Sequence, residues 1–200
     1  SGPGVFNCAW ALAGYMAQKI PVQIFQVGIA GVFRESGLGP GDVAVADEIQ
    51  YLHTGVRRPG KLPGPLPFAL ISDHPDTCFG RYSCDERLAT TCLRTLQKKR
   101  QDLTNERFQV VQGKILTVSQ ITGEIAQKMD IPGKKPPVME AMEGAAAAHG
   151  AALYGIPLVE IRAGSNMTGD RDKSRWNIPL AAGRISWVLD CLMDMDHIWE

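Results

Sequence analysis

Residues 136–176 read PPVMEAMEGAAAAHGAALYGIPLVEIRAGSNMTGDRDKSRW. Small, helix-favouring residues fill positions 144–154, and Gly155 after them is a typical helix C-terminal residue. The apolar run 158–161 predicts a buried strand, and the apolar segment before Met142 predicts another. The sequence therefore predicts a helix between two strands, as in an α/β protein.

A polar side chain follows each of these two predicted strands. Glu143 comes where the first strand gives way to the helix, and Ser165 and Asn166 come just beyond the second strand. In an open α/β sheet, ligands bind where strands end and loops begin. We therefore expect the carboxylate of Glu143 and the carboxamide of Asn166 to face one pocket.

The composition indicates one globular domain over residues 1–200. Of the 200 residues, 44% are hydrophobic and 21% are charged, which suffices for one sizeable core. The 21 basic and 21 acidic residues balance, which argues against nucleic acid or a membrane surface as a partner. No apolar run approaches the roughly 20 residues that span a bilayer, and no signal peptide is visible, so we expect a cytoplasmic protein.

The sequence shows no metal or cofactor motif. Its five cysteines are odd in number and lack zinc spacing, which favours free thiols in a reducing compartment. The four histidines are scattered, and neither GxGxxG nor GxxxxGK[ST] occurs. We therefore expect no metal site and no cofactor.

Hydrophobic periodicity extends the α/β pattern over the rest of the chain. The prediction is an α/β fold with a mixed central sheet flanked by helices. The segment 55–67, rich in proline and glycine, is expected to be a surface loop. Helices are expected at 7–19, 84–99, 123–128 and 180–199, and strands at 22–27, 42–51 and 108–118, the last as a strand pair or one bent strand.

Four short motifs, in this order along the chain, carry a resemblance to a known family: GIAG at 28–31, GDV at 41–43, MEG at 142–144, and EIR with SN at 160–166. Together they resemble the purine nucleoside phosphorylase and nucleosidase superfamily, and within it the futalosine hydrolases of menaquinone synthesis. The resemblance covers nearly the whole chain. It implies a nucleoside phosphorylase-like domain that lacks the N-terminal strand–helix segment, where the family's water-activating glutamate lies.

The resemblance also implies roles for particular residues. Ala30 and Gly31 would lie against a purine base, Met142 would form an apolar floor under the ribose, and Ser165 would line the site. Base-lining residues are expected among Thr117, Gln120, Ile121 and Thr122. The charged segment 170–175 is either a lid that closes with Trp176 over the substrate or a solvated loop paired with itself.

Cleavage of an N-glycosidic bond leaves positive charge on the ribosyl carbon and negative charge on the departing base. Glu143 could bind the ribose hydroxyls and stabilise the cation, or it could simply be a glutamate that favours a helix N-terminus. Asn166 could donate to a 6-oxo group and accept from a protonated N7, or it could cap a turn. Related nucleosidases that act on 6-aminopurines have aspartate at this position, so Asn166 favours hypoxanthine as the leaving base.

The expected reaction, implied by the resemblance, is hydrolysis of futalosine to hypoxanthine and dehypoxanthine futalosine. Two alternatives stay open: a phosphate-dependent 6-oxopurine nucleoside phosphorylase, with an anion site at residues 2–4 or Arg34, and a non-catalytic nucleoside-binding protein. The expected partners are a small nucleoside and other copies of the chain, as a homodimer or larger homo-oligomer. The sequence does not indicate the 5′ substituent of the substrate.

Overall fold

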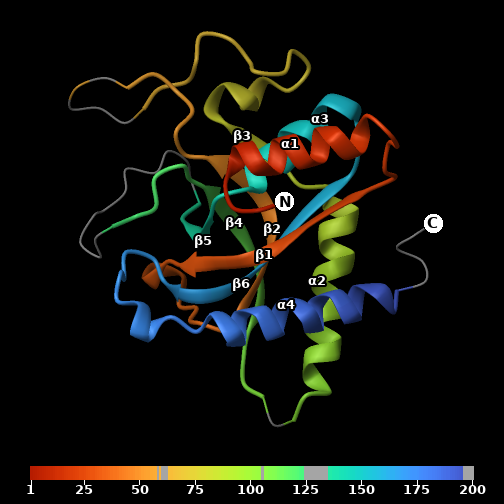
Figure 1. Cartoon of the computed structure of the whole chain (residues 1–200), viewed down its shortest axis with the longest axis vertical. Coiled ribbons are helices and arrows are strands. Elements are labelled where there is room, and N and C mark those ends of the chain that lie inside the picture. Colours follow the sequence, from red (N-terminus) through yellow and green to blue (C-terminus); the bar gives the residue numbers. More distant parts are fainter. Residues whose placement is uncertain (58, 60–62, 105, 124–134, 196–200) are drawn as a thin grey trace.

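The computed structural model describes residues 1–57, 59, 63–104, 106–123 and 135–195. Within these residues, six strands form a central sheet that is flanked by four α-helices (Figure 1). The helices are α1 (Val5–Met16), α2 (Glu86–Gln101), α3 (Gly144–Tyr154) and α4 (Ile178–Met193). The strands are β1 (Ile24–Val32), β2 (Val43–Tyr51), β3 (Arg81–Ser83), β4 (Val110–Thr117), β5 (Pro137–Ala141) and β6 (Leu158–Met167).

The sheet is mixed, as predicted, but it is not open. The strand order is β3-β2-β4-β5-β1-β6, and β6 pairs in addition with β2. This last pairing is antiparallel and joins Val43–Val45 to Ile161–Ala163. Through this pairing β2, β4, β5, β1 and β6 close into a ring, a closure on which the sequence analysis made no prediction.

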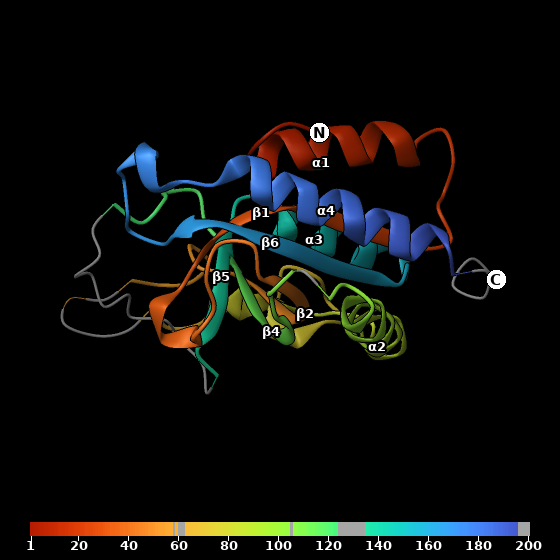
Figure 2. The same cartoon turned by 90° about the horizontal axis from the view of Figure 1, so that it is seen from below.

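Side-chain caps and small residues explain where the helices begin and how they pack. Asp85 caps α2 by accepting a hydrogen bond from the Leu88 amide (2.7 Å), and Asn177 caps α4 in the same way with Leu180 (3.1 Å). α3 buries mostly alanine, which lets the helix approach the sheet closely. α1 packs on α3 and forms the outer edge of the molecule, while α4 runs along β6 (Figure 2).

Two strands are longer than the sequence predicts. β1 continues through the glycine-rich segment 28–31 as far as Val32, and β6 continues through Ser165 and Asn166. These segments stay extended because β1 and β6 pair along their whole length, with a bulge where Ala30 meets Gly31. Glycine and polar residues therefore mark an irregularity inside each strand and not its end.

The other predicted elements have mixed outcomes. Residues 110–117 form one strand, β4, which selects the single-strand alternative. α4 begins two residues before the predicted start at 180 and ends at Met193. The helix expected at 123–128 lies, apart from Gly123, outside the described residues. Within the described part of the chain, no helix combines the length and the apolar character needed to cross a bilayer.

Candidate active site

Glu143 lies between the end of β5 and the first turn of α3, with its side chain 13% exposed. Its carboxylate makes no capping bond to α3. Instead, Oε1 accepts a hydrogen bond from the Gly4 amide (2.8 Å), and Oε2 pairs with Nη2 of Arg162 (3.0 Å). Oε2 also accepts from the Met142 amide (3.3 Å). The contacts to Gly4, which precedes α1, and to β6 are not explained by the interpretation as a simple helix-start glutamate.

Arg162 is a buried arginine shared by two carboxylates. Its Nη2 binds Glu143, and its Nε binds Oε1 of Glu160 at 2.8 Å. Its Nη1 donates to the carbonyl oxygen of Ile29 at 3.3 Å. Glu160 is fully buried, and this burial raises its pKa. One guanidinium therefore fixes the orientation of Glu143 from inside the protein.

Two glycines make room for this buried group. A Cβ atom at Gly28 would lie 2.5 Å from Nη1 of Arg162, and one at Gly144 would collide with the Glu160 carboxylate. Both glycines belong to the motifs that carry the family resemblance. Their role here is to let β1 and α3 approach the ion pairs of β6 closely.

Asn166 lies within β6, directly opposite Gly31 of β1. Its Nδ2 donates to the carbonyl oxygen of Met167 (3.0 Å), and its Oδ1 lies 2.8 Å from the Ser165 hydroxyl. That hydroxyl is also 3.1 Å from the carbonyl oxygen of Ala30. Asn166 therefore caps no turn, and its amide orientation is held by neighbouring strand atoms.

Strand β1 sets the spacing between these two groups. Arg162, which holds Glu143, is the register partner of Gly28, whereas Asn166 is the partner of Gly31. Three residues along a strand span about 10 Å. The structure thus places the two predicted catalytic residues beside one strand, at levels about three residues apart.

Glu140 flanks Gly31 on its other side. It lies on β5 opposite Gly31 and is 6% exposed. Its Oε1 accepts from the Thr122 amide (3.1 Å), and its Oε2 accepts a short hydrogen bond from the Thr122 hydroxyl. Burial raises the pKa of Glu140. Gly31, which has no side chain, therefore lies between Asn166 and a buried carboxyl group.

A family model described as Phosphorylase superfamily matches residues 1–190 of this chain. The chain belongs to this superfamily.

Curated relatives of this phosphorylase superfamily member include three futalosine hydrolases. The chain is 35% identical to that of Streptomyces coelicolor over 89 residues, which is 44% of this chain and 38% of the relative. It is 31% identical to that of Acidothermus cellulolyticus over 170 residues, which is 82% of this chain and 62% of the relative. The chain thus spans less than two thirds of the length of these two relatives.

Solved structures share the fold. A 5′-methylthioadenosine/S-adenosylhomocysteine nucleosidase from Colwellia psychrerythraea, in complex with adenine, matches with a TM-score of 0.76 at 22% identity, over 96% of this chain and 75% of that chain. Futalosine hydrolase of Helicobacter pylori matches with a TM-score of 0.73 at 15% identity, over 97% and 77% of the two chains. These matches confirm the predicted nucleosidase-like α/β fold.

The other residues that the sequence analysis assigned to the site lie mostly beside the residues described above, and Ile121 is more exposed than the rest. Ala30, Gly31, Met142, Thr122 and Ser165 lie next to the residues described above in the sequence or in the strand register. Ile121 is adjacent to Thr122 and is 49% exposed.

Trp176 follows a charged loop, residues 170–175, whose acidic and basic side chains pair with one another. Its Nε1 donates to the carbonyl oxygen of Asp170 (2.9 Å), and the Arg171 guanidinium lies 5.0 Å from the centre of its ring. Arg175 bridges Asp170 and Asp172 at 3.2 and 3.1 Å. These contacts match the self-paired alternative for residues 170–175 and show no contact of Trp176 with Glu143 or Asn166.

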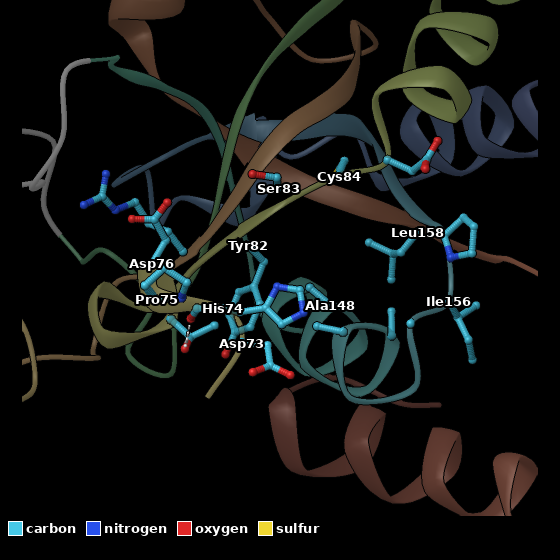
Figure 3. A pocket seen from close by; sticks show the side chains of 17 residues that line it. Asp73, His74, Pro75, Asp76, Tyr82, Ser83, Cys84, Ala148, Ile156 and Leu158 are labelled. Carbon is cyan, nitrogen blue, oxygen red and sulfur yellow. Dashed lines mark hydrogen bonds between the residues drawn. The ribbon is translucent and has the colours of Figure 1, made fainter. Parts of the chain in front are cut away.

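A cavity of about 380 Å³ lies elsewhere in the molecule (Figure 3). It is lined by the 3₁₀ segment Pro75–Phe79, by β3 and by the C-terminal part of α3. Neither Glu143 nor Asn166 lines it. Among the described residues, no group of three or more histidine, cysteine or acidic side chains is arranged to hold a metal ion.

The sequence analysis did not assign Arg162, Glu160 and Glu140 to the site. The first two could have been found from their alternate spacing in an otherwise apolar strand, since two charged residues on one face of a buried strand must be paired. Glu140 offered no such signal, because its partner Thr122 is distant in the sequence.

Proposed function

We propose that this chain hydrolyses the N-glycosidic bond of futalosine and releases hypoxanthine and dehypoxanthine futalosine for menaquinone synthesis. The observation that carries the proposal is the arrangement along β1. The Glu143 carboxylate is paired with Arg162, the register partner of Gly28, and Asn166 is the register partner of Gly31, about 10 Å of strand further along β1. This spacing fits the ribose and the base of one nucleoside.

Glu143 acts on the ribose in this proposal. Its carboxylate accepts hydrogen bonds from the 2′ and 3′ hydroxyls and places negative charge near the C1′ carbon as that carbon becomes cationic. Arg162 and the Gly4 amide keep the carboxylate in one orientation, so little reorganisation is needed when charge develops. Met142, the preceding residue, provides the apolar contact to the sugar.

Asn166 acts on the base. The purine lies over Gly31 and Ala30 in this proposal. A Cβ atom at Gly31 would lie 2.9 Å from Oγ1 of Thr168 and 3.7 Å from Nδ2 of Asn166, so only glycine lets β1 pass this close to the end of β6. The Asn166 amide donates to the 6-oxo group and accepts from the N7 proton, so the negative charge of the leaving hypoxanthine is stabilised. The C1′–N9 bond breaks and its electron pair passes to the base, while the oxygen of a water molecule forms the new bond to C1′. A proton from this water passes through solvent to the base, which leaves as neutral hypoxanthine.

The electrostatics of the site favour water over phosphate as the acceptor. The Gly4 amide at the start of α1, a candidate anion site, already binds the Glu143 carboxylate. Arg162 is paired with two carboxylates and cannot neutralise a phosphate as well. A phosphorylase would need a positive group that these contacts leave available.

The five cysteines are free, which supports a cytoplasmic protein, and the family resemblance supports a homo-oligomer.

The proposed reaction is tested by incubating the protein with futalosine, with and without phosphate, and measuring the released hypoxanthine by chromatography. We expect equal release in both samples. Release that requires phosphate would indicate a phosphorylase, and nucleoside binding without release would indicate a non-catalytic binder.

A further inference from the structure

The buried carboxyl group of Glu160 is connected to the candidate site only through Arg162. Its Oε1 accepts a hydrogen bond from Nε of Arg162 at 2.8 Å, and the same guanidinium pairs through Nη2 with Glu143 at 3.0 Å. The Glu160 side chain is 0% exposed and the Glu143 side chain is 13% exposed, so of the two carboxylates only Glu143 can touch a substrate. A role of Glu160 in the reaction must therefore be exerted through Arg162.

The fold accommodates this carboxyl group although it is unfavourable for stability. Oε2 of Glu160 has no hydrogen-bond partner among the described residues, and a buried oxygen without a partner is destabilising. The first residue of α3 must also be glycine, because a Cβ atom at Gly144 would collide with both oxygens of Glu160. Departures of this kind from the rules of stability are typical of functional sites.

The charge balance of the three side chains indicates what Glu160 adds. Glu143 and Arg162 alone would form a neutral pair, which would place little net charge beside the C1′ carbon. When Glu160 is ionised, two carboxylates share one guanidinium, and the group has one net negative charge. In a buried site such a charge is weakly screened, so it stabilises a nearby cation.

The protonation of Glu160 is set by opposing influences. Burial raises its pKa, and so does the charge of Glu143, whereas the Arg162 guanidinium favours the ionised form. The positive end of α3 lies against the carboxyl group and favours the ionised form as well. The thiols of Cys8 and Cys84 also lie close to Glu160, but burial raises the pKa of both, so they stay neutral near pH 7.

We propose that Glu160 is a positioning residue that acts through Arg162 to give the ribose end of the site a net negative charge. This role rests on the proposed function, because it requires that the ribose bind at Glu143. Glu160 itself neither touches the substrate nor transfers a proton. The site should therefore bind a cationic sugar more tightly than a neutral sugar of the same shape.

The affinity for a cationic sugar analogue tests this charge directly. The two probes are a hydroxylated pyrrolidine, which is protonated at pH 7.5, and its neutral cyclopentane counterpart, each joined through a methylene group to 9-deazahypoxanthine. Isothermal titration calorimetry gives the ratio of their dissociation constants. Glu160→Gln keeps an oxygen that can accept from Nε of Arg162. We expect it to lower the preference for the cationic probe by at least about 10-fold and to change the affinity for the neutral probe by less than about threefold.

The pH dependence of kcat for futalosine is a second readout, which a purely structural role would not change. Wild-type kcat should rise as Glu160 ionises, at a pH above the ordinary glutamate value of about 4.3. In Glu160→Gln this rise should be absent and kcat should be lower by at least about 10-fold, with little change in KM. Lys114→Met is the matched control for loss of a buried charge, because Lys114 is 1% exposed and pairs with Gln50 and Glu48 on β2. Its kcat should follow the wild-type profile.

A double variant provides the test if Glu160→Gln does not fold. Glu160→Ala combined with Gly144→Ala removes the carboxyl group and fills part of its space with the new methyl group. This variant should show the same lowered preference for the cationic pyrrolidine. Far-UV circular dichroism and thermal unfolding establish that each variant is folded.

Two results would overturn the role of Glu160. One is a folded variant without the carboxyl group that keeps the wild-type preference for the cationic probe, and the other is a wild-type pH profile of kcat in Glu160→Gln. A wild type that prefers the cationic probe but releases no hypoxanthine from futalosine would refute the proposed reaction and support the role of Glu160. A wild type that binds neither probe would refute both, because the ribose would then not bind at Glu143.

Discussion

Arg162 connects the ribose end of the candidate site to the protein interior. It binds the partly exposed Glu143 and the fully buried Glu160, so two carboxylates share one positive charge. Removal of one partner of such a group leaves an unpaired buried charge, which is costly. Substitutions that keep the size and hydrogen-bonding capacity of these side chains are therefore the most informative tests.

Glu143→Gln should abolish most activity and preserve the fold. The glutamine oxygen can still accept from the Gly4 amide, but the negative charge near C1′ is lost. We expect kcat for futalosine to fall by at least about 100-fold, with a smaller change in KM. Glu86→Gln, at an exposed position on α2, is the control. A rate within twofold of the wild type would remove Glu143 from the mechanism.

Asn166→Asp should reverse the preference for the base. An ionised aspartate cannot donate to a 6-oxo group but can accept from a 6-amino group, so kcat/KM for 6-oxopurine nucleosides should fall by about 10–100-fold relative to 6-aminopurine nucleosides. The measurement compares the wild type and the variant on inosine and adenosine. An unchanged ratio would contradict the assignment of Asn166 to the base.

Glu140→Gln should change how stability depends on pH. Burial raises the pKa of Glu140, so the folded state retains this proton to a higher pH than the unfolded state does. Between the unfolded value of about 4.3 and the folded pKa, the free energy of unfolding contributed by Glu140 decreases as pH rises. Urea unfolding between pH 4 and 7 should show a weaker decline for Glu140→Gln than for the wild type. Identical slopes would contradict this interpretation.

The packing of α3 on the sheet requires a close approach of its first residue, Gly144, to Glu160 on β6. A Cβ atom at Gly144 would collide with the Glu160 carboxylate, which is fully buried and cannot move into solvent. We expect Gly144→Ala to destabilise the protein by about 1–3 kcal/mol and to lower activity by displacing Arg162.

Gly183→Ala on α4 is the matched control for this change. Its Cβ atom would contact nothing within 4 Å, so this variant should be more stable by up to about 1 kcal/mol. Thermal unfolding measures both variants. Shifts of the same sign would contradict the packing argument.

The elements also show what the sequence could predict. The bounds 144–154 of α3 were predicted correctly because alanine-rich composition and a terminal glycine, Gly155 with φ of 63°, are local signals. The extensions of β1 and β6 were missed because they depend on pairing between segments about 130 residues apart. Glu143 and Asn166 could be proposed because they belong to short local motifs, whereas the role of Glu140 required knowledge of its partner Thr122, 18 residues away.

At the scale of the whole molecule, the arrangement of the cysteines allows a chemical test of the fold. Cys8, Cys84, Cys92 and Cys191 are buried, and only Cys78 of the five is partly exposed. Burial raises the pKa of Cys84 and of Cys92 to about 12.

Native protein at pH 8 should therefore expose one thiol per chain to rapid reaction with Ellman's reagent, and Cys78→Ser should remove it. Protein unfolded in guanidinium should react at all five positions, which serves as the control. Rapid reaction of three or more thiols in the native protein would contradict the packing described here.

The closed ring of strands has a consequence for synthesis on the ribosome. β6 completes the ring by pairing with β1 and β2, and it also supplies Arg162 and Asn166. While residues 158–167 remain in the exit tunnel, the nascent chain has neither the final barrel closure nor a way to orient Glu143. Binding competence should therefore arise only after β6 has emerged from the tunnel, and a product terminated before β6 should release no hypoxanthine from futalosine.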